Sequence, residues 1–226
     1  MQIEYAKFPW LSAILFCCVA GMLAIVFIPE ERKTLIKKVS VVFSGATLAL
    51  SAYLFFAYDK GVGGLQFAER VQWIPRFGIQ YFNAVDGFSL PNLLLTGIVF
   101  FTGVLTMWEL ENRVKEFFAL YFLMVAGVFG LFMSMDLFFI FVWYDVSLFP
   151  MYLLIAIWGT TRKEYGAMKL TLYLLAGSAL ILPAIIYLFA KSGLGTFDVA
   201  ALMHPGTFTL AQQKLAFIML FIGFGI

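Results

Sequence analysis

The stretch from Leu137 to Trp158, LFFIFVWYDVSLFPMYLLIAIW, is the most informative segment of this sequence. Its 22 residues make a helix of about 33 Å at about 1.5 Å per residue, which is enough to cross the hydrocarbon core of a bilayer. Asp145 is the single formally charged residue in it. An aspartate near the centre of a membrane helix costs roughly 2.5 to 3.5 kcal/mol on insertion scales. We therefore predict that the rest of the chain holds this carboxyl inside a membrane.

Pro150 lies five residues after Asp145 and interrupts the hydrogen bonding of the same predicted helix. Proline has no backbone N–H, so the carbonyl of Val146 loses its helical partner. A free carbonyl beside a carboxyl group is a place where water or an exchangeable proton can bind. We predict a proton or ion relay at Asp145. The alternative is a buried carboxyl that bonds to a serine or tyrosine and fixes a helix contact.

The composition places the whole chain among membrane proteins. It is 63% hydrophobic and 12% charged, whereas soluble domains are about 45–50% apolar and about 25% charged. The net charge of +2, with basic residues spread between apolar runs, argues against a nucleic-acid partner. Cys17 and Cys18 are adjacent within an apolar run, so we interpret them as buried thiols. No cleavage site follows that run, and we expect a membrane helix there instead of a signal peptide.

Six apolar segments are long enough to span a membrane, and they cover residues 10–28, 39–57, 90–108, 117–133, 137–158 and 165–190. A seventh begins near Leu215 and supplies 12 residues up to Ile226, whereas about 20 are needed to span. We therefore predict an all-α, polytopic transmembrane helix bundle with six full spans and an incomplete seventh, forming one membrane domain over residues 1–226. Either the chain is a piece of a longer one or a second polypeptide completes the seventh helix.

The connections between these segments predict the orientation of the bundle. Residues 58–89 and 191–213 are long and rich in Gly and Pro, and we expect ordered surface loops with short strands or turns there. The other links are short, which predicts antiparallel neighbouring helices. Eight Lys and Arg lie in the three short links, and six are spread over the longer segments of the opposite side. The positive-inside rule then predicts cytoplasmic short links, with the N-terminus and both long loops outside.

Lys169 is the second ionisable candidate, near the start of the sixth apolar run, where its stem can snorkel to the surface. Asp145 would lie about 12 Å from the outer end of its helix, and Lys169 about 6 Å from the cytoplasmic end of the next. In a hydrocarbon core of about 30 Å, their depths differ by about 12 Å. We therefore expect a water-linked path between the two side chains and no direct ion pair.

Residues around these two are expected to support them. Asp136, in the sequence SMDL, is predicted to be the N-cap of the fifth span. The small-residue run AGSA at residues 176–179 predicts close helix packing, with the hydroxyl of Ser178 as a polar group. The sequence contains no evident nucleophile–base pair, nucleotide-binding loop or metal-ligand spacing. We therefore expect no metal, no cofactor and no bond-making chemistry on this chain.

Several of these motifs carry a family resemblance. The segments SMDLFF at 134–139, WYD at 143–145, PMYLLIAIWG at 150–159 and KLTLYLLAGS at 169–178 resemble the antiporter-like membrane subunits of respiratory complex I. VDGFSLP at 85–91 and WIP at 73–75 point to chain M, the mitochondrial subunit-4 type. The resemblance implies the N-terminal half of a proton-translocating, non-redox subunit of NADH–quinone oxidoreductase. It also implies that NAD, FMN, iron–sulfur clusters and quinone are bound by partner subunits.

The same resemblance implies that Asp145 and Lys169 transfer protons, with Pro150, Ser178 and Asp136 in supporting roles. The family usually has glutamate at the position of Asp145, one methylene longer. It also has a lysine on the seventh helix, which is expected directly after FIGFGI at residues 221–226. A complete pumping unit is therefore expected to need residues outside this sequence.

Two other functions remain open at this point. One is a subunit of a Mrp-type cation/proton antiporter or a membrane-bound hydrogenase, and the other is an inert structural or assembly membrane protein. The predicted partners are other membrane subunits of complex I, the lipid bilayer and a polypeptide that completes the seventh helix. The predicted location is the bacterial inner (plasma) membrane, with an energy-coupling organelle membrane as the alternative.

Overall fold

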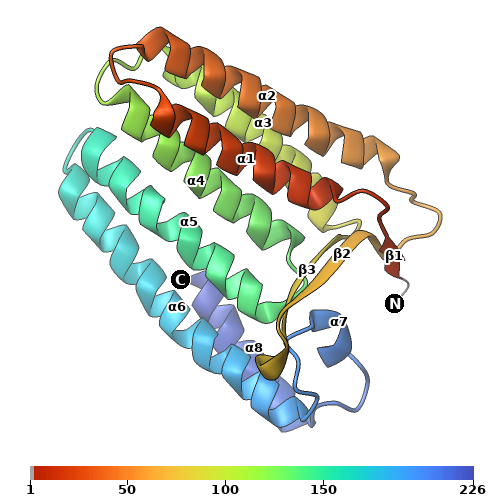
Figure 1. Ribbon diagram of the computed structural model, residues 1–226. Helices are drawn as coiled ribbons and strands as arrows, with labels where there is room; N and C mark the ends of the chain where they lie inside the picture. The colour runs from red at the N-terminus through yellow and green to blue at the C-terminus, as the bar shows by residue number, and fades with distance from the viewer. Residues whose placement is uncertain (1–2) are drawn as a thin grey trace.

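Long helices lie side by side in the computed structural model, which describes residues 3–226, and a small sheet covers one end of them (Figure 1). The long helices are α1 (Trp10–Phe27), α2 (Lys33–Ala57), α3 (Ser89–Thr106), α4 (Val114–Met133), α5 (Leu137–Trp158), α6 (Lys163–Ser192) and α8 (Leu210–Gly225). A four-residue helix, α7, covers Val199–Leu202. The strands are β1 (Ile3–Tyr5), β2 (Leu65–Ile74) and β3 (Ile79–Val85), and two 3-10 turns cover Pro75–Phe77 and Met107–Glu109.

Six helices within residues 3–226 are long and apolar enough to cross a membrane, and this confirms the predicted all-α polytopic bundle. They are the six segments that the sequence predicts, from α1 to α6. α8 is a shorter apolar helix of 16 residues. The chain is thus an integral membrane protein by the length and composition of its helices.

The three short links α1–α2, α3–α4 and α5–α6 gather at one end of the bundle, and the sheet and α7 lie at the other (Figure 1). Consecutive helices are therefore antiparallel, as the short links predict. We call these two ends the link end and the hairpin end. Which end faces the cytoplasm stays a prediction from the distribution of Lys and Arg.

α4 lies at the centre of the bundle, because it contacts α1, α3 and α5. Half of its membrane-length window is buried, compared with 11% in α5. Its large aromatic residues Phe118, Phe122 and Phe129 are fully buried in the main hydrophobic core. Phe122 packs so closely on α1 that a Cβ at Gly21 would lie 2.4 Å from its ring. α5 thus packs on this buried central helix on one side and on α6 on another.

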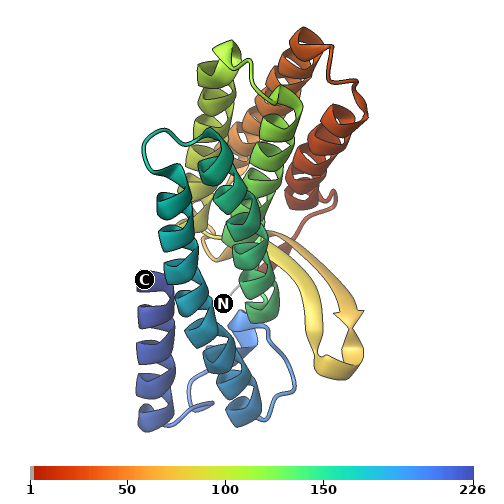
Figure 2. The same ribbon diagram turned by 90° about the vertical axis from the view of Figure 1, so that its left-hand side faces the viewer.

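The predicted loop between α2 and α3 folds into a β2–β3 hairpin, with β1 added in parallel on the free edge of β2. The hairpin turns at Gly78, which has a φ of +65°. A Cβ at Gly78 would lie 1.8 Å from the carbonyl oxygen of Gly195, so the turn packs directly against the connection from α6 to α8. Figure 2 shows the β2–β3 hairpin extending to one side of the helices.

Two helices start more than one helical turn before the predicted residue. α8 begins at Leu210, five residues before the predicted Leu215, so the connection after α6 is shorter than residues 191–213. Thr209 and Gln212 form a capping box that starts this helix among polar residues, where the hydropathy pattern gives no signal. α2 begins at Lys33, because charged residues continue the helix beyond its apolar part. Both helices thus extend outside the apolar segments by about one turn or more.

Candidate functional site

The carboxylate of Asp136 starts α5, the helix that carries Asp145. Its Oδ1 accepts hydrogen bonds from the N–H groups of Phe138 at 2.9 Å and Phe139 at 3.3 Å, which confirms the predicted N-cap. Its Oδ2 accepts the N–H of Gln80 at 3.1 Å, so β3 is attached to the same carboxylate. Burial raises the pKa of Asp136 above its ordinary value, and the hydrogen bonds from these three backbone N–H groups offset only part of that rise.

Asp145 lies on the ninth residue of α5, about 12 Å along the helix from its start. The side chain is half-buried, and its Oδ1 is fully buried without a hydrogen-bond partner in residues 3–226. The indole Nε1 of Trp143, two residues earlier, is buried and unpartnered within the same described part of the chain. Pro150 lies inside α5 and is buried, so the helix continues through a position that has no N–H. An unpartnered carboxylate oxygen and a carbonyl without a helical N–H partner thus occur within two turns of one membrane helix.

Lys169 lies on the next helix, α6. It is exposed on α6 and lines an open, mostly apolar groove of about 430 Å³ with Tyr165, Met168, Leu172, Tyr173 and Ala176. Its Nζ lies over the ring of Tyr173, 5.9 Å from the centroid. The two ion pairs in residues 3–226 are Arg70–Asp198 and Arg113–Glu116, so Asp145 and Lys169 do not pair directly.

The small-residue run on α6 packs against α8. A Cβ at Gly177 would lie 2.4 Å from the carbonyl oxygen of Gly223, which confirms the close packing predicted for this run. Ser178 is buried, and its hydroxyl donates to the carbonyl of Leu175 at 3.2 Å within its own helix. The polar group of Ser178 is therefore satisfied locally.

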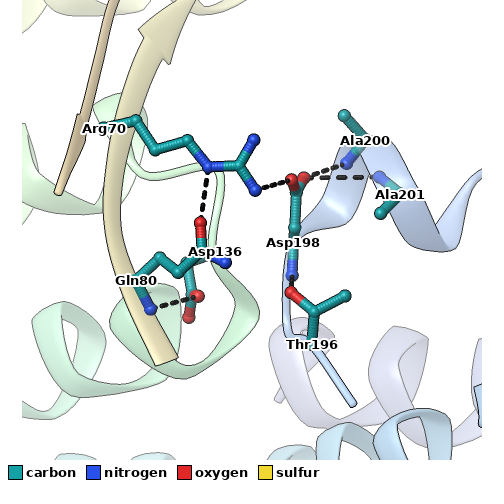
Figure 3. A network of polar contacts seen from close by, with 7 residues as sticks. All are labelled: Arg70, Gln80, Asp136, Thr196, Asp198, Ala200 and Ala201. Atoms are coloured by element: carbon teal, nitrogen blue, oxygen red, sulfur yellow. Dashed lines mark hydrogen bonds and ion pairs between the residues drawn. The ribbon is translucent and has the colours of Figure 1, made fainter. Parts of the chain in front are cut away.

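A polar network at the hairpin end joins three separate parts of the chain (Figure 3). Arg70 of β2 donates to Oδ2 of Asp198 at 2.9 Å and, through its Nε, to the side chain of Gln80. Asp198 in turn caps α7, accepting the N–H groups of Ala200 and Ala201. Sequence reasoning missed both Arg70 and Asp198. The sequence Asp198-Val-Ala-Ala contains an N-cap signal, but the pairing with an arginine 128 residues away has no local signal.

A carboxylate on the hairpin itself caps α1. Glu69 of β2 accepts the N–H of Leu11 at 2.7 Å and the N–H of Ser12 at 3.1 Å. Glu69 also accepts a hydrogen bond from the hydroxyl of Ser12. The hydroxyl oxygen of Ser12 in turn lies 2.9 Å from the hydroxyl oxygen of Tyr81. Burial raises the pKa of Tyr81, which keeps this phenol protonated. The hairpin therefore holds the starts of both α1 and α5.

Comparisons with known proteins agree with this architecture. A family model described as "NADH:quinone oxidoreductase/Mrp antiporter, TM" matches residues 134–226. NAD(P)H-quinone oxidoreductase chain 4 1 of Nostoc sp. is 34% identical over the whole chain, which covers 42% of that relative. Chain 4 3 of Trichormus variabilis is also 34% identical, over 97% of this chain and 41% of its own length. The chain thus spans about two fifths of the length of these relatives, which fits the expected N-terminal half.

Solved structures give the same relationship. A chain of respiratory complex I from Thermus thermophilus superposes with a TM-score of 0.81 at 25% identity, over 96% of this chain and 43% of that one. The fold also recurs in the Mrp complex from Dietzia sp., with a TM-score of 0.74 at 18% identity, over 94% of this chain and 23% of that one. Over its whole length this chain is thus similar to about two fifths of chain 4 of the NAD(P)H-quinone oxidoreductases, and it shares the fold of a chain of respiratory complex I.

Proposed function

We propose that this chain is part of a proton-translocating membrane subunit of an NADH:quinone oxidoreductase, in which Asp145 accepts and releases a proton. The observation that carries the proposal is the buried, unpartnered Oδ1 of Asp145 within a membrane-length helix. A carboxyl group at this depth needs a proton, a cation or water to offset its desolvation. The similarity to chain 4 of NAD(P)H-quinone oxidoreductases supports coupling of that proton to quinone reduction.

In this proposal Lys169 is the second proton-transfer residue, and water links it to Asp145. A change of charge at Asp145 alters how tightly a nearby amine holds its proton, and the two titrations become coupled. Pro150 supports the path by leaving the carbonyl of Val146 open to water. Asp136 fixes the start of α5, and Ser178 offers a hydroxyl on α6.

The redox chemistry is proposed to take place on partner subunits, which bind NAD, FMN, iron–sulfur clusters and quinone. This chain takes part in the enzyme without carrying a cofactor or metal, and other membrane subunits and lipid cover its exposed faces. More than half of the length of the relatives lies outside the region they share with this chain, so a complete pumping unit needs that part as well. It is supplied by the same or by a second polypeptide in the bacterial plasma membrane or an energy-coupling organelle membrane.

A subunit of a cation/proton antiporter or membrane-bound hydrogenase is the second candidate function. The matched family model includes Mrp antiporters in its description, and the Mrp complex shares the fold. Co-purification distinguishes the two: flavin and iron–sulfur subunits bound to the tagged protein support the oxidoreductase, whereas Na⁺-dependent transport without redox subunits supports the antiporter. An inert assembly protein would show neither activity.

Substitution of Asp145 tests the proposed function. In membrane vesicles, Asp145→Asn is expected to reduce NADH-driven proton uptake at least about tenfold while the complex still assembles on native gels, because the amide cannot ionise. Asp59→Asn, at an exposed position before β2, is the matched control and leaves uptake unchanged. Unchanged proton uptake by an assembled Asp145→Asn complex would remove Asp145 from the mechanism.

A further inference from the structure

The direction in which Asp145 points depends on how α5 is rotated about its own axis. α5 packs along α4, and two α4 glycines three residues apart form the contact. A Cβ at Gly130 would lie 2.3 to 2.6 Å from atoms of the Trp143 indole. A Cβ at Gly127 would lie 2.8 Å from Cβ of Ser147 and 3.0 Å from the carbonyl oxygen of Trp143. Trp143 and Ser147 therefore face α4 with no room for a methyl group between the helices.

Asp145 stands midway between these two contact residues in the sequence. Each residue turns an α-helix by about 100°, so Trp143 and Ser147 both lie about 160° around the axis from Asp145. The carboxyl group is consequently on the side of α5 opposite to the α4 contact. Any rotation that relieves a clash at the glycines swings the carboxyl through the same angle.

We propose that Gly127 and Gly130 are positioning residues for the proton-transfer carboxyl of Asp145; this inference rests on the proposed function. The two glycines contact different kinds of atoms on α5, a side chain in one case and the main chain in the other. At Gly130 the obstacle is the indole ring of Trp143, which can be made smaller by substitution. At Gly127 the obstacles include the backbone N of Ser147 at 2.9 Å, so the main chain of α5 itself must move.

Size exchange across this contact tests the inference in the full subunit within its assembled complex. Gly130→Ala is expected to lower proton uptake at least about fivefold and to shift the pH of half-maximal uptake, because Asp145 meets a different environment. Trp143→Leu removes the obstructing ring. In the double variant, Gly130→Ala with Trp143→Leu, the rate of proton uptake and the pH of half-maximal uptake are expected to return toward those of the unmodified complex. Gly166→Ala in α6 is the control, since no atom lies within 4 Å of a Cβ there.

The outcomes separate this inference from the proposed function. If Asp145→Asn abolishes uptake but assembled Gly130→Ala retains the normal rate and pH profile, the positioning role is wrong and the proposed function stands. If Asp145→Asn pumps normally, the proposed function itself fails. If the Gly130→Ala complex does not assemble, the pH profile of proton uptake is measured for Trp143→Leu alone. This variant tests the positioning role because loss of the indole ring frees α5 to rotate. A shifted pH profile supports the positioning role, and an unchanged profile overturns it.

Discussion

The backbones of Asp136 and Asp198 lie side by side in an isolated antiparallel β-bridge, which brings two acidic residues together. The two carboxyl groups have different hydrogen-bond partners. Asp136 caps α5 and bonds to the backbone of Gln80, whereas Asp198 caps α7 and forms an ion pair with Arg70. This arrangement attaches the hairpin to the start of the Asp145 helix and to the connection that leads to α8.

Removing Arg70 should loosen this attachment. Arg70→Ala leaves the nearly buried carboxylate of Asp198 without its cation, and we expect a loss of about 1–3 kcal/mol in the free energy of unfolding. The loss stays below that of a fully buried pair because the side chain of Arg70 is 35% exposed. Thermal unfolding in detergent measures the effect, with Arg76→Ala at the hairpin tip as control. Equal melting temperatures for Arg70→Ala and the unmodified protein would show that the ion pair contributes nothing.

The charge of Asp136 should make stability depend on pH. Its pKa is raised above the ordinary value of 3.8, so the folded protein binds this proton more tightly than the unfolded chain does. The contribution of Asp136 is therefore fully present below pH 3.8 and is lost as the pH rises through the raised pKa. The stability of the unmodified protein relative to Asp136→Asn should decrease over this window and then stay constant. Melting temperatures across the acidic range measure this, and a difference that grows with pH would contradict it.

Glu69 should stabilise α1 from outside the helix. Pro9, at the N-cap position, gives no side-chain hydrogen bond, and the carboxylate of Glu69 accepts the N–H groups of Leu11 and Ser12 instead. We expect Glu69→Ala to cost about 1–2 kcal/mol, the range of a lost helix cap. Gln72→Ala, exposed on the same strand, is the matched control. The prediction is wrong if both variants unfold at the same temperature.

The membrane helices could be predicted from the sequence because their signals are local. A run of apolar residues fixes each span, and Asp136 directly before α5 gives a short-range cap signal that the structure confirms. The early start of α8 was equally local, in Thr209 and Gln212, but hydropathy alone does not detect a capping box. Local chemistry thus accounts for nearly all helix positions in the bundle.

The contacts between distant segments could not be predicted in the same way. The pairing of Arg70 with Asp198 depends on how the hairpin folds over the end of the bundle, which no pattern within either segment specifies. The same holds for Lys169, whose face of α6 follows only from the packing of α6 against α5 and α8. Sequence reasoning could give the depth of Asp145 and Lys169 along their helices, but not the sides on which they lie.

The role of Asp145 as a proton carrier can be measured as the number of protons pumped per NADH oxidised, compared between Asp145→Asn and Asp145→Glu complexes. Glutamate keeps an ionisable carboxyl group at this position in α5 and should retain most of the pumping. Asparagine should lower the ratio while quinone-dependent NADH oxidation remains measurable. Equal ratios in the two assembled complexes would contradict the claim that a proton passes through the carboxyl group of Asp145.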